Sequence, residues 1–104
     1  MKLKFKYFKC VRDGSKTVDA RLYYPSYRRV EPGMTIRFVC GKLMCDKIVD
    51  RKKVYGSFRE MLVGEGVENC LPGVKDIDTG VSEYHGLYSE NLRNSYQVVS
   101  FRLK

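Results

Sequence analysis

The chain has 104 residues, which is enough for one domain with its own hydrophobic core and too few for two. Its composition, 43% hydrophobic and 31% charged, is that of a folded protein and excludes a disordered chain. No apolar run approaches the roughly 20 residues of a membrane-spanning helix, and residues 1–6 alternate instead of forming a signal-peptide core. We therefore expect one soluble domain over residues 1–104, intracellular and without a membrane partner, in the cytoplasm or, as the alternative, the nucleus.

The positive charge is concentrated in the first half of the chain. Residues 1–53 hold 15 Lys and Arg against 5 Asp and Glu, a balance of +10, whereas residues 54–104 hold 5 against 7, a balance of −2. A basic region on a folded domain is typical of proteins that bind the phosphates of nucleic acids. Basic proteins without such a partner are also common, so charge alone does not decide between the two.

The four cysteines form no metal-binding pattern. Cys10, Cys40, Cys45 and Cys70 contain no CxxC pair, and the single histidine, His85, lies 15 residues from the nearest of them. This spacing argues against a zinc site, and we expect neither a metal nor a cofactor. Cysteines among apolar neighbours are most simply core thiols in a reducing compartment.

The first half of the chain predicts short strands joined by turns. Residues 3–13 fit both a strand and a helical stripe, and we favour an extended start that passes into a helix of about two turns ending at Gly14. Strands are expected at 17–23, 34–40 and 43–55, with a turn at Glu31-Pro32-Gly33 and a reversal at Gly41-Lys42.

The second half predicts helices followed by one strand. Ser57 and Glu60 form a capping box for a helix over 58–63. Asp78 or Thr79 is expected to cap a second helix whose apolar stripe reaches Tyr88, and a short helix follows at 89–95. A final strand is expected at 96–103. Without a βαβ rhythm, this order predicts the α+β class, with a small mixed β-barrel flanked by short helices.

One strand carries the strongest candidate site. After Gly14, side-chain alternation places Thr17, Asp19 and Arg21 on one face, while the intervening residues 18, 20 and 22 are apolar. With Lys16 at the turn, a small polar ligand would meet a cation, an anion and a hydroxyl together. The alternative is an edge strand with a solvated ion pair.

Aromatic and basic residues alternate in the loop that follows. Tyr24 and Tyr27 lie beside Arg28 and Arg29, a combination suited to stacking on bases and holding phosphates of single-stranded nucleic acid. The alternative is a packed loop with solvated arginines. The run 51–53 is more typical of a solvated sheet edge than of a ligand site, but Lys53 is kept among the expected RNA contacts.

Segments spread over nearly the whole chain resemble the ASCH domain of the PUA-like superfamily. They are GSKTVDARLY (14–23), Arg28-Arg29, EPGMTIRF (31–38), YGSFREML (55–62), ENCLPGVK (68–75), GVSEY (80–84) and Leu87-Tyr88-Ser89. The resemblance is strongest to the compact stand-alone members of that family. It implies a small PUA-like barrel that binds RNA in a cleft beside the first strand, with Lys16, Asp19 and Arg21 as its floor and Tyr55 and Ser57 on a neighbouring wall.

The same resemblance implies an alternative enzymatic role. Some ASCH relatives remove the acetyl group of N4-acetylcytidine with a Lys, a Thr and a Glu. Lys16 matches the lysine, Asp19 stands where the threonine is expected, and Glu68 or Glu65 is a loose counterpart of the glutamate. Because a carboxylate cannot act as a hydroxyl nucleophile, this departure argues against the same mechanism.

Three functions therefore remain open. The first is an RNA-binding module that holds single-stranded or modified RNA through a basic cleft next to residues 14–21. The second is a hydrolase for a modified nucleoside, or a ribonuclease, with Lys16, Asp19 and Glu68 as catalytic groups. The third is a protein-interaction domain whose basic face meets an acidic partner. The sequence predicts no oligomeric state.

Overall fold

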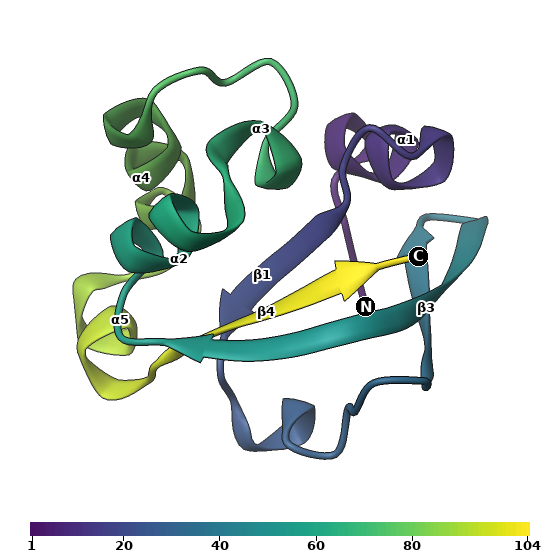
Figure 1. The fold of residues 1–104 in the computed structure, drawn as a ribbon, viewed down its shortest axis with the longest axis horizontal. Coiled ribbons are helices and arrows are strands. Elements are labelled where there is room, and N and C mark those ends of the chain that lie inside the picture. The colour runs from purple at the N-terminus through teal and green to yellow at the C-terminus, as the bar shows by residue number, and fades with distance from the viewer.

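The computed structural model describes all residues from Met1 to Lys104 as an α+β fold around one curled sheet (Figure 1). Its strands β1 to β4 follow the order β1-β4-β3-β2, and all neighbours are antiparallel. The expected α+β class is therefore confirmed. The elements in chain order are α1 (Phe5–Asp13), β1 (Val18–Leu22), the 3₁₀ helix η1 (Pro25–Tyr27), β2 (Thr35–Cys40), β3 (Leu43–Tyr55), α2 (Phe58–Glu65), α3 (Val67–Cys70), α4 (Ile77–His85), α5 (Glu90–Ser95) and β4 (Val98–Leu103).

The sheet curls into a half-barrel, and the first residues of the chain lie along its open edge. The amide of Leu3 donates to the Val39 carbonyl at 3.0 Å, and the amide of Val39 donates to the Met1 carbonyl at 2.9 Å. On the other side, Arg21 Nη2 of β1 donates to the Lys2 carbonyl at 3.0 Å. The N-terminal segment thus bridges the two outer strands, and its contact with β2 is the one parallel pairing in the sheet.

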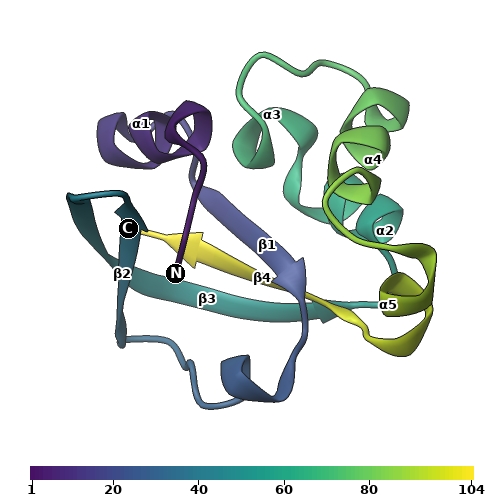
Figure 2. The same cartoon turned by 180° about the vertical axis from the view of Figure 1, so that it is seen from behind.

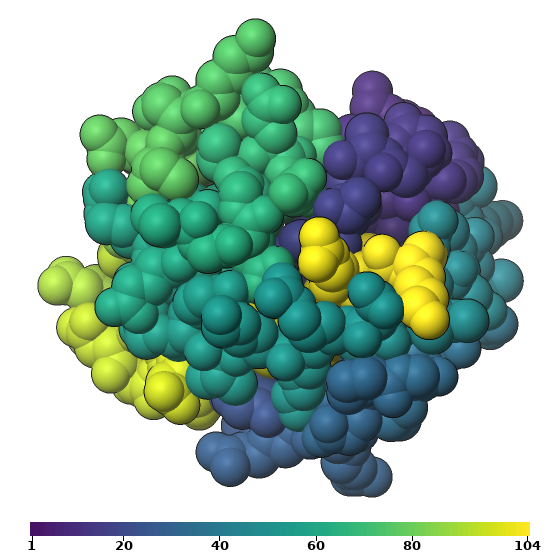
Figure 3. All heavy atoms as spheres, viewed as in Figure 1, coloured from purple at the N-terminus to yellow at the C-terminus, as the bar shows by residue number.

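Two hydrophobic cores pack on opposite sides of the central strand β4. Val98 belongs to the core that β1 forms with α2, α3 and α4, whereas Val99 and Phe101 belong to the core inside the curled sheet, beneath α1. Successive side chains of a strand point to opposite faces, so Val98 and Val99 face different cores and both are apolar, while the buried Ser100 donates to Glu65. In the space-filling view, the end of β4 emerges between α1 and β3 (Figure 3).

The helical layer lies on one side of the sheet, with α1 apart from it (Figure 2). Helix α4 can approach α2 closely because residue 80 is glycine: a Cβ there would lie 2.9 Å from side-chain atoms of both Leu62 and Val67. None of the helices is both long and apolar enough to cross a membrane.

Several element boundaries differ from those expected. Helix α1 begins at Phe5, so only the first residues are extended, and it ends as expected at Gly14, where φ is +87°. Helix α2 runs to Glu65, beyond the expected end at residue 63. Helix α4 is capped by Asp76, whose carboxylate accepts from the Thr79 amide at 2.9 Å. The expected cap at residues 78–79 is wrong because Asp76 offers a carboxylate three residues ahead of an amide in the first turn.

Ser57 acts as the N-cap of α2, and its replacement tests this structural role. Its hydroxyl oxygen accepts from the Glu60 amide at 3.1 Å. We expect Ser57→Ala to lower the free energy of unfolding by about 1 kcal/mol, because one helix-terminal amide loses its acceptor. Urea unfolding measures this change. Ser57→Asp should restore the stability, and a variant as stable as the wild type would contradict the capping role.

Candidate functional site

A cleft of about 410 Å³ lies between the N-terminal segment, α1, strand β1 and helix α4. Strand β1 forms its floor, and α4 with the following turn forms one wall, opposite Tyr7 of α1. Seven of its thirteen lining residues are hydrophobic. Its charged lining residues are Lys2, Lys4, Lys16, Asp19, Arg21 and Glu83, and its aromatic ones are Tyr7, Tyr84 and Tyr88.

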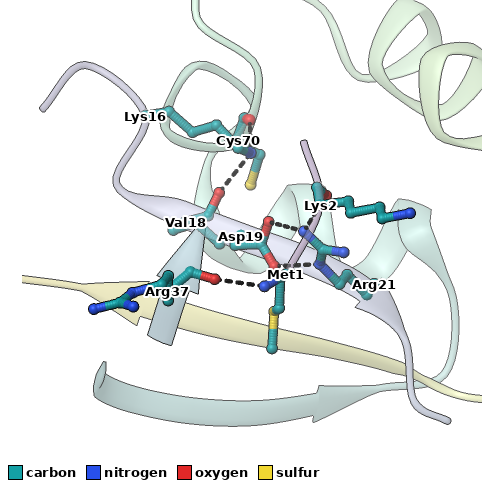
Figure 4. A network of polar contacts seen from close by, with 8 residues as sticks. All are labelled: Met1, Lys2, Lys16, Val18, Asp19, Arg21, Arg37 and Cys70. Atoms are coloured by element: carbon teal, nitrogen blue, oxygen red, sulfur yellow. Dashed lines mark hydrogen bonds and ion pairs between the residues drawn. The ribbon is translucent and has the colours of Figure 1, made fainter. Parts of the chain in front are cut away.

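Lys16 is a buried cation at the floor of this cleft, with only 4% of its surface exposed. Its Nζ donates to the Val18 carbonyl at 2.7 Å and to the Cys70 carbonyl (Figure 4). These two bonds use two of the three ammonium hydrogens, so one donor remains for another acceptor. Burial lowers the pKa of Lys16, and the negative charge of Asp19 partly opposes this shift. The position thus holds an amine that loses its proton more easily than usual.

Asp19 and Arg21 form a two-point ion pair on the same face of β1. Arg21 Nε lies 2.8 Å from Asp19 Oδ2, and Arg21 Nη2 lies 3.3 Å from Oδ1 (Figure 4). Burial disfavours the guanidinium charge, but the charge and hydrogen bonds of Asp19 outweigh this effect and raise the pKa of Arg21, with a smaller contribution from Tyr27. Asp19 is only 2% exposed, so the alternative of a solvated edge pair is wrong.

Tyr84 lines the wall of the cleft and carries a buried hydroxyl without a partner. The residue is 4% exposed, and no other group of the protein lies within hydrogen-bonding distance of its oxygen. Burial raises the pKa of this phenol well above its usual value. The ring is held by stacking on Phe58, with the centroids 4.6 Å apart and the planes 9° from parallel. Buried hydroxyls normally have a partner, which makes this one a candidate ligand contact.

Tyr7 and Glu83 connect the two walls across the cleft. The Tyr7 hydroxyl of α1 donates to Glu83 Oε2 of α4 at 2.9 Å. Burial and this hydrogen bond raise the pKa of Tyr7 to about 12. The structure therefore places Glu83 at the cleft, whereas Glu68, the expected catalytic carboxylate, is exposed on α3 and does not line it. Sequence reasoning missed Glu83 and Tyr84 because their helical spacing is that of an ordinary amphipathic helix.

The expected wall of Tyr55 and Ser57 is wrong. Neither residue lines the cleft: Ser57 caps α2, and the Tyr55 hydroxyl donates to Glu65. Glu65 also accepts from Arg51 and from the Ser100 hydroxyl, so it belongs to a separate buried network. Lys53 and Thr17 were also expected at the site, and neither lines the cleft. The Lys53 ammonium lies over the Tyr55 ring, and the backbone of Thr17 is hydrogen-bonded to the backbones of Asn69 and Leu103.

The aromatic loop lies outside the cleft and is joined to it by a chain of rings. Tyr88 lines the cleft and packs edge-to-face against Tyr24, with centroids 6.5 Å apart. Tyr24 in turn stacks on Tyr27 at 6.1 Å. Arg28 and Arg29 follow and are exposed, with the Arg28 guanidinium 5.6 Å from the centre of the Tyr23 ring. The loop thus extends the cleft with half-buried rings that are followed by exposed cations.

Neither a metal site nor a reactive thiol is visible in this arrangement. No three His, Cys, Asp or Glu side chains are grouped so that they could hold a metal ion. Cys70, whose carbonyl accepts from Lys16, is buried, and this burial raises the pKa of its thiol to about 12. A thiol in this state is a poor nucleophile at neutral pH.

The lowered pKa of Lys16 predicts a pH dependence of stability. The unfolded chain binds this proton more tightly than the folded protein does, so the Lys16 contribution to stability rises with pH between its lowered folded pKa and 10.5. We expect the free energy of unfolding of the wild type, minus that of Lys16→Met, to increase across that window. Denaturant titrations between pH 7 and 10.5 measure this difference, and a flat difference would contradict a desolvated amine.

Comparison with known proteins gives structural relatives without a stated function. No protein-family model matches the chain, and no curated protein matches it. The crystal structure of hypothetical protein PH0355 is 40% identical, with a TM-score of 0.90 over all of this chain and 94% of that one. The solution NMR structure of protein PF0455 from Pyrococcus furiosus is 36% identical, with a TM-score of 0.76 over all of this chain and 96% of that one. At this identity and coverage, the chain belongs to the same protein family as PH0355 and PF0455.

Proposed function

We propose that this protein is an RNA-binding module whose cleft holds one unpaired nucleotide. The main observation is that one cleft is lined by three polar features. They are the Lys16 ammonium, the Asp19–Arg21 pair and Tyr84 with its unpartnered hydroxyl. The resemblance of the sequence to the ASCH domain supports the same function, and a PUA-like barrel is part of this proposal. Proteins that share a fold often differ in function, so the proposal rests on the side chains of the cleft.

The cleft has the size and chemistry that a nucleobase requires. Its volume of about 410 Å³ falls in the range of small-molecule pockets, and apolar residues make up about half of its lining. Base edges present both donors and acceptors. Lys16 offers a free N–H, Tyr84 offers a hydroxyl, and the Asp19 oxygens keep lone pairs beyond those that Arg21 uses. This mixture suits the edge of a base better than it suits a purely anionic group.

The surface beside the cleft fits the nucleotides on either side of the bound one. The rings of Tyr88, Tyr24 and Tyr27 extend from the cleft to the exposed arginines of the loop. Single-stranded RNA binds such surfaces by stacking bases on rings and placing phosphates on cations. A base inside an A-form duplex cannot reach a buried floor, so the bound nucleotide must be unpaired.

RNA binding predicts a preference for single strands, a strong salt dependence and a specific role for Tyr84. We expect a mixed-sequence single-stranded RNA to bind more tightly than a blunt duplex of equal length, and each phosphate contact to add about −0.7 to the slope of log K against log salt. Tyr84→Phe should weaken binding several-fold, whereas the free energy of unfolding should stay equal or rise, because an unpaired buried hydroxyl is removed. Fluorescence anisotropy and urea unfolding measure the two quantities.

Tyr55→Phe is the matched control, because it also removes one tyrosine hydroxyl but lies outside the cleft. We expect this variant to lose stability, since Glu65 loses a donor, and to bind RNA as the wild type does. Equal effects of both variants on binding, a preference for the duplex, or no binding at low salt would each overturn the proposal.

A hydrolase acting on a modified nucleoside is the second candidate, favoured by the shared position of Lys16 and Glu83 on the cleft. In hydrolysis of N4-acetylcytidine, water adds to the acetyl carbon, the C–N bond breaks, and acetate and cytidine are released. The remaining Lys16 N–H would stabilise the negative charge on the acetyl oxygen, and Asp19 or Glu83 would accept a proton from the water and return it to N4 as the C–N bond breaks. Asp19 replaces the expected threonine, so no hydroxyl nucleophile takes part.

Acetate release tests this second function directly. We expect wild-type protein incubated with N4-acetylcytidine to yield cytidine and acetate, and Lys16→Met to yield neither, because the oxyanion loses its donor. Mass spectrometry of both samples, with Tyr55→Phe as an active control, measures the products. Equal product from wild type and Lys16→Met would indicate a contaminating enzyme and contradict the assignment.

A further inference from the structure

Three lysines lie at the mouth of the cleft, Lys2 and Lys4 in the N-terminal segment and Lys6 in the first turn of α1. Lys2 and Lys4 line the cleft itself, and Lys4 and Lys6 line a second, outer hollow of about 390 Å³. The two hollows share Lys4, Tyr7, Glu83 and Leu87, so they lie next to each other. None of the three lysine ammoniums has a carboxylate within 4.0 Å, although six other ion pairs form in the protein.

Tyr7 lines both hollows, and two lysines lie near its ring. Lys16 Nζ, at the floor of the cleft, lies 5.8 Å from the centre of this ring, and Nζ of Lys6, a residue of the outer hollow, lies 5.3 Å from it. A ligand that reaches from the floor to the surface therefore meets a buried cation first and exposed cations afterwards. In the close-up, the Lys2 carbonyl faces Arg21 while its side chain extends away from the Asp19 carboxylate (Figure 4).

The outer hollow has the composition of an anion site. Besides Lys4 and Lys6 it contains Ser82 and Thr79, of which the Thr79 hydroxyl already donates to Asp76 Oδ2 at 2.9 Å, and its one carboxylate, Glu83, accepts from Tyr7. Lys4 is also the N-cap of the nine-residue helix α1, whose first turn holds no acidic residue. The free amides and the dipole at this helix end favour negative charge near the two ammoniums.

We propose that this outer hollow binds the phosphate of the nucleotide whose base occupies the cleft, an inference that rests on the proposed function. The opposite orientation is disfavoured because a phosphate on the floor would lie beside the buried Asp19 carboxylate. The ligand class is therefore a nucleoside phosphate, free or within an RNA chain. A nucleoside without phosphate fills only the inner part of the site.

The experiment compares nucleosides with their phosphates. Isothermal titration calorimetry is run at constant ionic strength with the four ribonucleosides, their 5′- and 3′-monophosphates and inorganic phosphate. For the base that binds best, we expect one monophosphate to bind roughly tenfold more tightly than the nucleoside, because charge-assisted hydrogen bonds to phosphate are added. Inorganic phosphate alone should bind far more weakly than the monophosphate.

The double variant Lys4→Gln/Lys6→Gln should abolish that tenfold preference, measured as the ratio of monophosphate affinity to nucleoside affinity within the same variant. It should also reduce the salt slope for single-stranded RNA by about 1.4, which corresponds to two lost phosphate contacts. The matched control is Lys9→Gln/Lys42→Gln, which removes the same charge at exposed positions outside both hollows and should retain the preference.

The outcomes separate this inference from the function on which it rests. If wild-type protein binds neither RNA nor any nucleotide, both are overturned. If RNA binding depends on Tyr84 but the preference for monophosphate is absent, or survives in Lys4→Gln/Lys6→Gln, only the phosphate site is overturned. Loss of the preference in the control variant as well would reduce the effect to bulk charge and overturn it too.

Discussion

The buried ion pair between Asp19 and Arg21 is the interaction on which the cleft depends. It fixes both side chains on β1. Arg21 Nη2, which contacts Asp19 Oδ1, also donates to the Lys2 carbonyl. The N-terminal segment is thereby attached to β1 by a side chain and to β2 by backbone hydrogen bonds. One charged pair thus positions the floor of the cleft and the lysine-bearing segment at its mouth.

Lys16 connects this floor to the helical layer. Its ammonium joins the carbonyl at the start of β1 to the carbonyl at the end of α3, which are 52 residues apart in the sequence between Val18 and Cys70. Both acceptors are neutral, so the positive charge is solvated by the backbone but not cancelled by a directly bonded carboxylate. The third N–H of this ammonium therefore remains for a ligand, and a neutral electron-rich atom such as a base oxygen or nitrogen would complement it.

Local patterns predicted the part of the site that lies within one strand. Alternation along 17–22 places Asp19 and Arg21 on one face, and Gly14 ends α1 through its positive φ, so both follow from the sequence. Tyr84 and Glu83 could not be found in this way, because only the packing of α4 beside β1 turns them toward the cleft. The error at Tyr55 and Ser57 has the same origin: resemblance supplied residues without the tertiary geometry that decides which wall they face.

The buried polar groups of the cleft cost folding free energy, which indicates that they are there to bind a ligand. A lysine with no directly bonded carboxylate, a buried ion pair and a hydroxyl without a partner are each less favourable than well-packed apolar residues of similar size. The Glu65 network shows the contrast, because there every carboxylate oxygen has a partner within the protein. Polar groups that are left incompletely satisfied on a concave surface are the ones that a bound molecule can complete, and here they surround a single hollow.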